Sequence, residues 1–234
     1  MNLLSSPVFI RLRSLTRTLG INQIVNRVLA TRRYEDRFRT ALFQNVRLGD
    51  TVWDIGANVG VYSSEFGIAV GTSGNVLAFE PVPSCFEQLR AHCAALPQVH
   101  AHNVAIGDKS GKLVMTIEAN PLAATHRVVE ANGASTSDGT IEVPVRSVDD
   151  FAKEHADQFP NVLKIDVEGH EGSVIKGMSE TLRDPRVRCV GMEIHFALLE
   201  ARQEAEAPRM IESRLKNSGF RVQWTDASHV VAVR

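Results

Sequence analysis

One short run of the chain combines residue types that could hold a nucleotide-like cofactor. In the run Val-Trp-Asp-Ile-Gly-Ala-Asn-Val-Gly, Asp54, Gly56 and Gly60 lie where an apolar strand should give way to a helix. Ligands of open α/β sheets bind just beyond the carboxyl ends of the strands. Gly56 lets the backbone turn sharply beside a ligand, because it has no Cβ. The residues expected to touch the cofactor in this loop are Asp54, Gly56, Ala57, Asn58 and Gly60.

The carboxylate of Asp54 discriminates between two classes of cofactor. It suits a ligand ammonium group, whereas a dinucleotide pyrophosphate would face it with the same charge. S-adenosylmethionine carries an amino group that is an ammonium at neutral pH and a sulfonium, whereas NAD carries neither an ammonium nor a sulfonium. The glycine spacing also differs from the G-x-G-x-x-G of dinucleotide sites. We therefore predict S-adenosylmethionine as the cofactor, with an NAD-dependent oxidoreductase or a non-catalytic binding module as the alternatives.

Two further positions extend the predicted cofactor site. Glu80 follows the apolar stretch 75–79 and lies about 20 residues past the last glycine, the separation at which an acidic residue accepts ribose hydroxyls. A third short strand is expected at 99–102. Asn103 and Ala105 follow it and are expected beside the adenine.

Acidic residues and a histidine gather at the ends of two later strands, expected at 162–165 and 187–194. A buried parallel strand should be continuously apolar, yet Lys164 interrupts the first of them. The carboxyl ends of both strands should border the cofactor pocket. The residues predicted to surround the reacting groups are Asp166, Glu168, Glu193 and His195.

This cluster has three possible roles. In methyl transfer, an oxygen nucleophile must be aligned and its proton accepted, and a histidine of near-neutral pKa such as His195 suits the base role. A carboxylate could orient the histidine or take the proton itself. Oxygen ligands with one imidazole could instead bind Mg²⁺ or Mn²⁺, although our favoured interpretation has no metal. The third interpretation is structural: ion pairs of Lys164 with nearby acids, and a helix N-terminus that favours Glu168 and Glu171.

Alternating strands and helices predict an α/β domain with a mostly parallel sheet and helices on both faces. Residues 1–48 are expected to form an N-terminal helical extension packed on a core domain of residues 49–234. The regular alternation is interrupted by two expected strands, 112–117 and 140–145, and by the loop 118–139 between them. That loop is either a solvated hairpin connection or a substrate lid.

The bulk composition excludes little and fits a soluble domain. The chain has 234 residues and a formal net charge of −1, so nothing global indicates a nucleic-acid partner. Its three cysteines are widely spaced, which fits reduced thiols and a cytoplasmic location. Near the N-terminus, Arg11, Arg13 and Arg17 have no acidic neighbours. They form either a solvated helical face or a contact with a membrane surface or an anionic substrate.

These motifs together resemble the FkbM family of methyltransferases. The resemblance rests on the cofactor loop, on Phe-Glu-Pro at 79–81, on residues 103–108, and on Leu-Lys-Ile-Asp-Val-Glu-Gly-His-Glu at 163–171 with Lys176-Gly177. It covers roughly residues 50–200, and the stretch 163–171 is its most specific part.

The resemblance implies a Rossmann-like class I methyltransferase fold with seven strands. It also implies O-methylation of a sugar, glycan or polyketide-type hydroxyl. The positions that it places at the cofactor are Asp54, Gly56, Asn58, Gly60 and Glu80, with Asp166 beside them. The N-terminal extension and the loop 118–139 lie outside the matched part, so the resemblance does not fix the acceptor.

Overall fold

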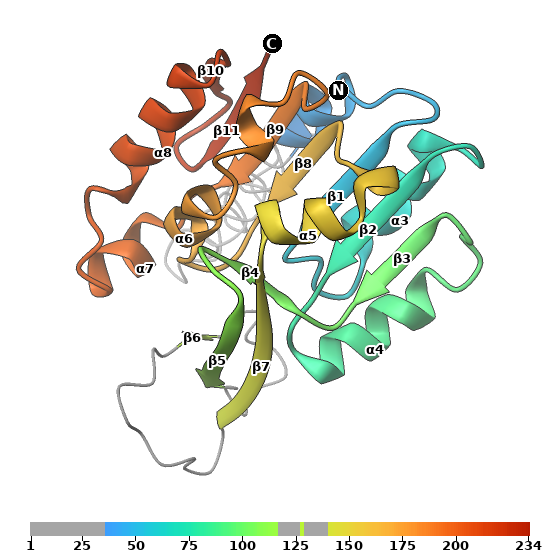
Figure 1. Cartoon of the computed structure of the whole chain (residues 1–234), viewed down its shortest axis with the longest axis horizontal. Helices are drawn as coiled ribbons and strands as arrows, with labels where there is room; N and C mark the ends of the chain where they lie inside the picture. Colours follow the sequence, from blue (N-terminus) through green and yellow to red (C-terminus); the bar gives the residue numbers. More distant parts are fainter. Residues whose placement is uncertain (1–35, 117–126, 129–139) are drawn as a thin grey trace, which may run out of the picture.

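The computed structural model describes residues 36–116, 127–128 and 140–234, which are built around a seven-stranded sheet (Figure 1). The strand order is β10-β11-β9-β8-β1-β2-β3, and every neighbouring pair is parallel except those that involve β11. The mostly parallel seven-stranded sheet is thereby confirmed. Its strands are β1 (Thr51–Ile55), β2 (Asn75–Phe79), β3 (Val99–His102), β8 (Val162–Ile165), β9 (Cys189–Glu193), β10 (Arg221–Trp224) and β11 (His229–Val233).

Helices cover both faces of this sheet, as predicted. One face packs against residues 36–43, which are helical, and against α3 (Val61–Val70) and α4 (Pro83–His92). The other face packs against α5 (Val148–Glu154), α6 (Glu171–Lys176) and α8 (Ala207–Asn217). Successive side chains of a strand point to opposite faces of the sheet. Trp53 of β1 therefore packs in the core on the side of α5, α6 and α8, and its neighbour Val52 packs in the core on the side of α3.

A second, smaller sheet stands at the carboxyl edge of the main one (Figure 1). Its order is β4-β7-β5-β6, with the strands β4 (Ala105–Gly107), β5 (Gly111–Thr116), β6 (Arg127–Val128) and β7 (Thr140–Ser147). The two strands expected at 112–117 and 140–145 are present with slightly shifted bounds. The three-residue strand β4 was not predicted, because three residues carry no usable periodicity. Most of the loop 118–139 lies outside the described residues.

The helix that begins at Glu171 is short. It ends at Lys176, and a short 3₁₀ helix follows at Thr181–Arg183. The carbonyl of Gly177 accepts the N–H of Asp149 at 2.9 Å instead of an intrahelical one. The Asp149 carboxylate in turn accepts the N–H groups of Glu180 and Thr181 at 3.0 and 2.8 Å. Contacts with α5 therefore redirect the chain, and these come from a distant part of the sequence.

The chain between β9 and α8 also differs from expectation. A short helix, α7 (Phe196–Ala201), directly follows the site histidine, where none was predicted. The expected strand 187–194 is shorter than predicted, with β9 covering Cys189–Glu193.

Residues 36–48 are the described part of the proposed N-terminal extension. Phe38 and Leu42 are buried and lie close to the backbone at Gly191, where an added Cβ would meet Leu42 at 2.8 Å. The arginines Arg11, Arg13 and Arg17 lie outside the described residues. Within the described ranges, no helix is long and apolar enough to cross a bilayer. The three cysteines all lie in the described ranges, are buried and form no disulfide.

The close approach of α6 to β4 gives a stability prediction. A Cβ at Gly177 would lie 2.0 Å from the carbonyl oxygen of Gly107, whereas a Cβ at Gly111 would meet nothing within 4 Å. We expect Gly177→Ala to lower the free energy of unfolding by about 1–3 kcal/mol, because overpacking displaces backbone. Gly111→Ala is the matched control and should stay within about 0.5 kcal/mol of wild type. Urea unfolding measures both, and equal stabilities would contradict the close approach.

Candidate functional site

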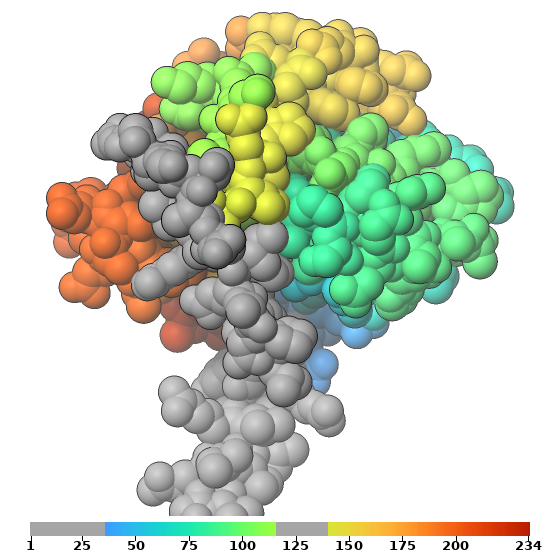
Figure 2. Space-filling model, turned by 90° about the horizontal axis from the view of Figure 1, so that it is seen from below, coloured from blue at the N-terminus to red at the C-terminus, as the bar shows by residue number. Residues whose placement is uncertain are grey.

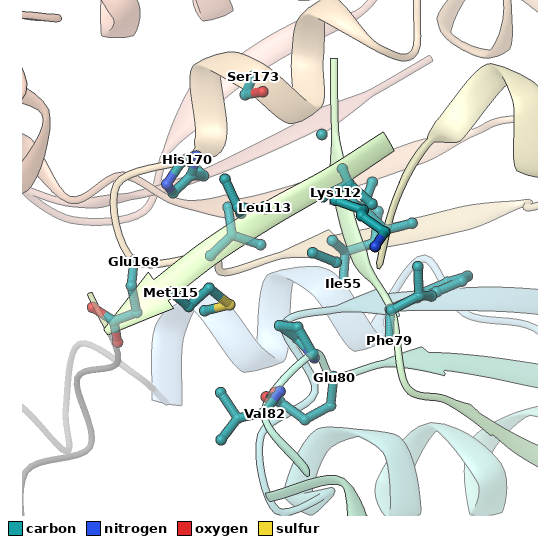
Figure 3. Close-up of a pocket in the computed structure, with 18 of the residues that line it drawn as sticks. Ile55, Phe79, Glu80, Val82, Lys112, Leu113, Met115, Glu168, His170 and Ser173 are labelled. Atoms are coloured by element: carbon teal, nitrogen blue, oxygen red, sulfur yellow. Dashed lines mark hydrogen bonds between the residues drawn. The ribbon is translucent and has the colours of Figure 1, made fainter. Parts of the chain in front are cut away.

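A cavity of about 540 Å³ opens where β1, β2 and β8 end and the second sheet begins. This volume lies within the usual range for small-molecule sites. Figure 3 shows Glu80 and Glu168 toward different ends of the cavity, with Met115 of β5 between them. The predicted residues that line it are Gly56, Asn58, Glu80, Ala105, Asp166 and Glu168. The structure thus brings the two sequence motifs together around one space.

The glycine at position 56 is required by a close approach of two loops. Its φ is +80°, and a Cβ there would lie 1.8 Å from the carbonyl oxygen of Asp166. The loop after β1 is therefore pressed directly against the loop after β8. Asn58 and Glu168 line the cavity from these two loops, and both have positive φ values, 49° and 47°. Backbone strain of this kind concentrates at functional sites.

Glu80 is held in place by the loop that it faces. Its carboxylate accepts the N–H of Asn58 at 2.8 Å and that of Val82 at 2.9 Å. The residue is 5% exposed. Burial raises the pKa of Glu80 to about 7, although the two backbone donors and Lys164 act in the opposite direction. Each carboxylate oxygen keeps a further lone pair that can accept a hydroxyl of a ligand.

Asp54 lies behind the cavity wall rather than on it. Its side chain is fully buried, and its two oxygens face Ser63 Oγ at 2.6 Å and Lys164 Nζ at 3.2 Å. The Lys164 ammonium also contacts the carbonyl of Gly56 at 3.0 Å and Asp166 Oδ2 at 3.4 Å. The sequence predicted that Asp54 pairs with an ammonium group of the ligand. In this structure Asp54 instead pairs with the ammonium group of Lys164. The ion pairs of Lys164 with neighbouring acids that one interpretation foresaw are present.

Three other predicted cofactor residues shape the loops without lining the cavity. Ala57 is buried, and its N–H donates to Phe79 at 3.0 Å. Gly60 has a φ of +87°, and a Cβ there would meet Leu89 of α4 at 2.6 Å. The glycine therefore allows the loop to pack closely against α4. The Asn103 amide donates to the backbone carbonyl of Glu80 at 2.8 Å, which holds the loop after β2.

His195 lies at the centre of the acidic cluster. Its Nδ1 donates to Glu171 Oε1 at 2.8 Å, and Glu171 is fully buried. Its Nε2 faces three carboxylates, Glu168 at 3.3 Å and Asp166 and Glu193 at 3.8 Å each. The predicted cluster is therefore assembled around one imidazole, and a buried carboxylate fixes the tautomer of the neutral ring by accepting from Nδ1.

The pKa of His195 differs from the near-neutral pKa that the sequence led us to expect. Burial lowers the pKa of His195, but the hydrogen bond to Glu171 and the charges of Glu171, Glu168 and Glu193 outweigh it and raise it to about 9. In the free protein the ring is therefore an imidazolium at neutral pH. Burial also raises the pKa of Glu168 to about 6. A carboxylate of the cluster is consequently a better proton acceptor at pH 7 than sequence reasoning indicated.

Three ligand atoms of this cluster, from Asp166, Glu168 and His195, lie within 4.8 Å of one another. Carboxylate oxygens with one imidazole suit a hard divalent cation, and Glu171 would then orient the histidine as second-layer carboxylates do. The metal interpretation therefore has a geometric basis.

Several residues of the site were not assigned from the sequence. His229 lies at 3.4 Å from Glu193 and is itself held by Asp226 at 2.9 Å. Sequence reasoning could not find it, because it depends on the antiparallel pairing of β11 with β9. The apolar wall formed by Leu113 and Met115 was also missed, since no site residue was predicted in the strand expected at 112–117.

His170 directly precedes α6. It accepts a hydrogen bond from Arg202 at 2.6 Å. Burial, with the nearby charge of Arg202, lowers the pKa of His170 to about 3, so the ring is neutral. It also lines the cavity.

Residues 54–222 match the methyltransferase FkbM domain. The chain belongs to this family. S-adenosylmethionine, the predicted cofactor, is thereby confirmed, as is the resemblance on which the sequence analysis ended.

Individual relatives share about a third of their residues with this chain over the matched region. The chain is 32% identical over 161 residues to the hexuronic acid methyltransferase AglP of Haloferax volcanii, covering 66% of this chain and 59% of that protein. It is 30% identical over 176 residues to the 31-O-demethyl-FK506 methyltransferase FkbM of Streptomyces tacrolimicus, covering 64% and 67%. The fold matches that of SMU.1697c from Streptococcus mutans, in complex with SAH, with a TM-score of 0.50, 9% identity and coverage of 82% and 92%.

The burial of Glu80 gives a pH-dependent prediction. Its pKa is about 7 in the folded protein against an ordinary value of 4.5, so between these values only the folded state holds the proton. The stability from this group is complete below about pH 4.5 and is lost as the pH rises through 7, by on the order of 2–3 kcal/mol. We expect the unfolding free energy of wild type to fall relative to Glu80→Gln between pH 5 and pH 8. Parallel urea-unfolding profiles of the two proteins would refute this.

Proposed function

We propose that this FkbM-family protein is an O-methyltransferase that transfers the methyl group of S-adenosylmethionine to a hydroxyl of a glycan or a polyketide-type metabolite. The observation that carries the proposal is the junction of the two loops at Gly56 and Asp166, which places the His195 cluster beside the cofactor loop. The names of the relatives support the acceptor class, since one is a hexuronic acid methyltransferase and another a 31-O-demethyl-FK506 methyltransferase.

In this proposal Glu80 and Asn58 hold the nucleoside end of the cofactor. Glu80 lines the cavity with lone pairs free for ribose hydroxyls, and Asn58 is fixed beside it by their hydrogen bond. Asp54 acts through Lys164, positioning Gly56 and Asp166 rather than contacting the ligand. Asp166, at the opposite loop, would lie near the cationic part of the cofactor, where a negative charge is favourable.

The reaction itself needs an aligned oxygen and a proton acceptor. Bound S-adenosylmethionine would supply the methyl group to the acceptor oxygen, and the neutral His195 Nε2 would accept the proton that this hydroxyl loses. For this the ring must first lose the proton that its carboxylate neighbours stabilise. Glu168 and Glu193 lie close enough to His195 to hold the acceptor hydroxyl or to receive the proton in its place.

One titration tests the cofactor residues and also the NAD-dependent oxidoreductase that the sequence alone had left open. Calorimetry with S-adenosylmethionine should show saturable binding, and Glu80→Ala should weaken it by about tenfold or more, because two ribose hydrogen bonds are lost. Tight binding of NADH in place of S-adenosylmethionine would overturn the proposal.

The base role gives a kinetic prediction. We expect His195→Ala to reduce turnover by about 10²–10⁴-fold, the usual contribution of a general base, while the dissociation constant for S-adenosylmethionine changes little. His92→Ala is the matched control, because His92 is an exposed histidine of α4. Transfer of labelled methyl groups to a panel of glycan and macrolactone acceptors measures the turnover. Wild-type turnover in His195→Ala would move the base role to Asp166 or Glu168.

The same assay tests the metal interpretation. If the residues act without a metal, extensive dialysis against EDTA leaves turnover unchanged. Loss of activity that Mg²⁺ or Mn²⁺ restores would instead assign Asp166, Glu168 and His195 as ligands of a divalent cation.

A further inference from the structure

Two exposed aromatic side chains lie beside the His195 cluster. Phe196 directly follows His195 at the start of α7 and is 45% exposed, and Trp224 ends β10 and is 36% exposed. Their rings are stacked, with centroids 6.0 Å apart and an interplanar angle of 30°. Among the described residues, the other large exposed apolar side chains, Leu48, Val61 and Ile68, are aliphatic.

The topology of the sheet brings Phe196 and Trp224 to the edge of the main sheet at which Glu193 lies. β11 runs antiparallel between β9 and β10, so β10 points in the same direction as β9. Trp224 therefore ends at the same edge as Glu193, two strands away. Figure 2 shows the α7 surface, in deep orange, on the face seen from below. The helix also touches the loop of Glu168, because a Cβ at Gly169 would meet Leu198 at 2.8 Å.

The Trp224 ring is held by a contact with α8. Glu212 of α8, which pairs with Lys216 at 2.6 Å, also accepts a hydrogen bond from the Trp224 indole. The polar edge of the indole is thus satisfied within the protein. A tethered and partly exposed aromatic face is an arrangement that recognises ligands at little cost in side-chain entropy.

We propose that Phe196 and Trp224 form a platform on which a sugar ring of the acceptor stacks while a hydroxyl of the glycan reaches the His195 cluster. The proposal rests on the proposed O-methylation. The C–H face of a pyranose packs against aromatic rings, and its hydroxyls point outward at the rim.

The charges around the platform favour a sugar over an apolar chain. The carboxylates of Asp166, Glu168 and Glu193 are each about 30% exposed, so they remain accessible to a ligand. Sugar hydroxyls can donate to these carboxylates as the site loses water. A hydrocarbon acceptor would desolvate them without replacing the lost hydrogen bonds, which is costly.

Tryptophan fluorescence tests binding without turnover. The chain has two tryptophans, and Trp53 is fully buried, so acrylamide quenching reports on Trp224. We expect a tetrasaccharide containing hexuronic acid, or a neutral tetrasaccharide, added to the full chain with S-adenosylhomocysteine, to lower the quenching constant about twofold or more. Lack of protection by both sugars, or protection by a macrolactone alone, would overturn the platform.

Variants then separate the platform from the reaction. In the methyl-transfer assay, Phe196→Ala and Trp224→Ala should raise KM for the glycan about tenfold or more, with little change in kcat or in cofactor affinity. Trp224→Phe should restore much of the loss, and Ile68→Ala, an exposed apolar residue of α3, should match wild type.

The two proposals fail in different ways. Protection of Trp224 by a sugar without methyl transfer would leave the platform and remove the proposed reaction. Methyl transfer to a glycan with an unchanged KM in both alanine variants would leave the reaction and remove the platform.

Discussion

The buried ammonium of Lys164 is the interaction on which the site depends. It joins the carboxylate of Asp54 on β1, the carbonyl of Gly56 in the cofactor loop and the carboxylate of Asp166 after β8. An ion pair removed from water contributes little net stability, because desolvation offsets the attraction. Its value lies in geometry: each partner that moved away would leave a buried charge uncompensated. The two loops that carry Asn58 and Glu168 are thereby held at a fixed separation.

Electrostatic balance extends outward from this centre. Asp54 and Lys164 neutralise each other within the core. The carboxylates around His195 are compensated by the imidazolium of that residue, and Glu193 also contacts His229, which pairs with Asp226. A positively charged methyl donor entering such a site competes with the proton on His195 for the same carboxylates. Binding of the cofactor would then lower the pKa of His195, so that the arrival of the donor prepares the base.

The sequence predicted the parts of this protein that depend on local patterns. Short, mostly apolar runs such as 51–55 and 162–165 located the parallel strands, and Gly56 and Glu80, predicted beside the strand ends, both line the cavity, because these signals arise within a few residues. Contacts between distant segments were not predictable. The early end of α6 depends on Asp149, the position of His229 depends on an antiparallel register, and Asp54 found its partner in Lys164, more than one hundred residues away.

The position of the antiparallel strand β11 has a consequence for how such a protein can diversify. In the proposed arrangement the donor would be held by the loops after β1, β2 and β8, whereas β9, α7 and the terminal hairpin of β10 and β11 come later in the chain and form one flank of the same sheet edge. Substitutions between β9 and the end of β11 would change the surface proposed to receive the acceptor and leave Lys164 and the two loops that it joins intact. New acceptor specificities could therefore arise in this C-terminal part of the chain without changes at the donor site.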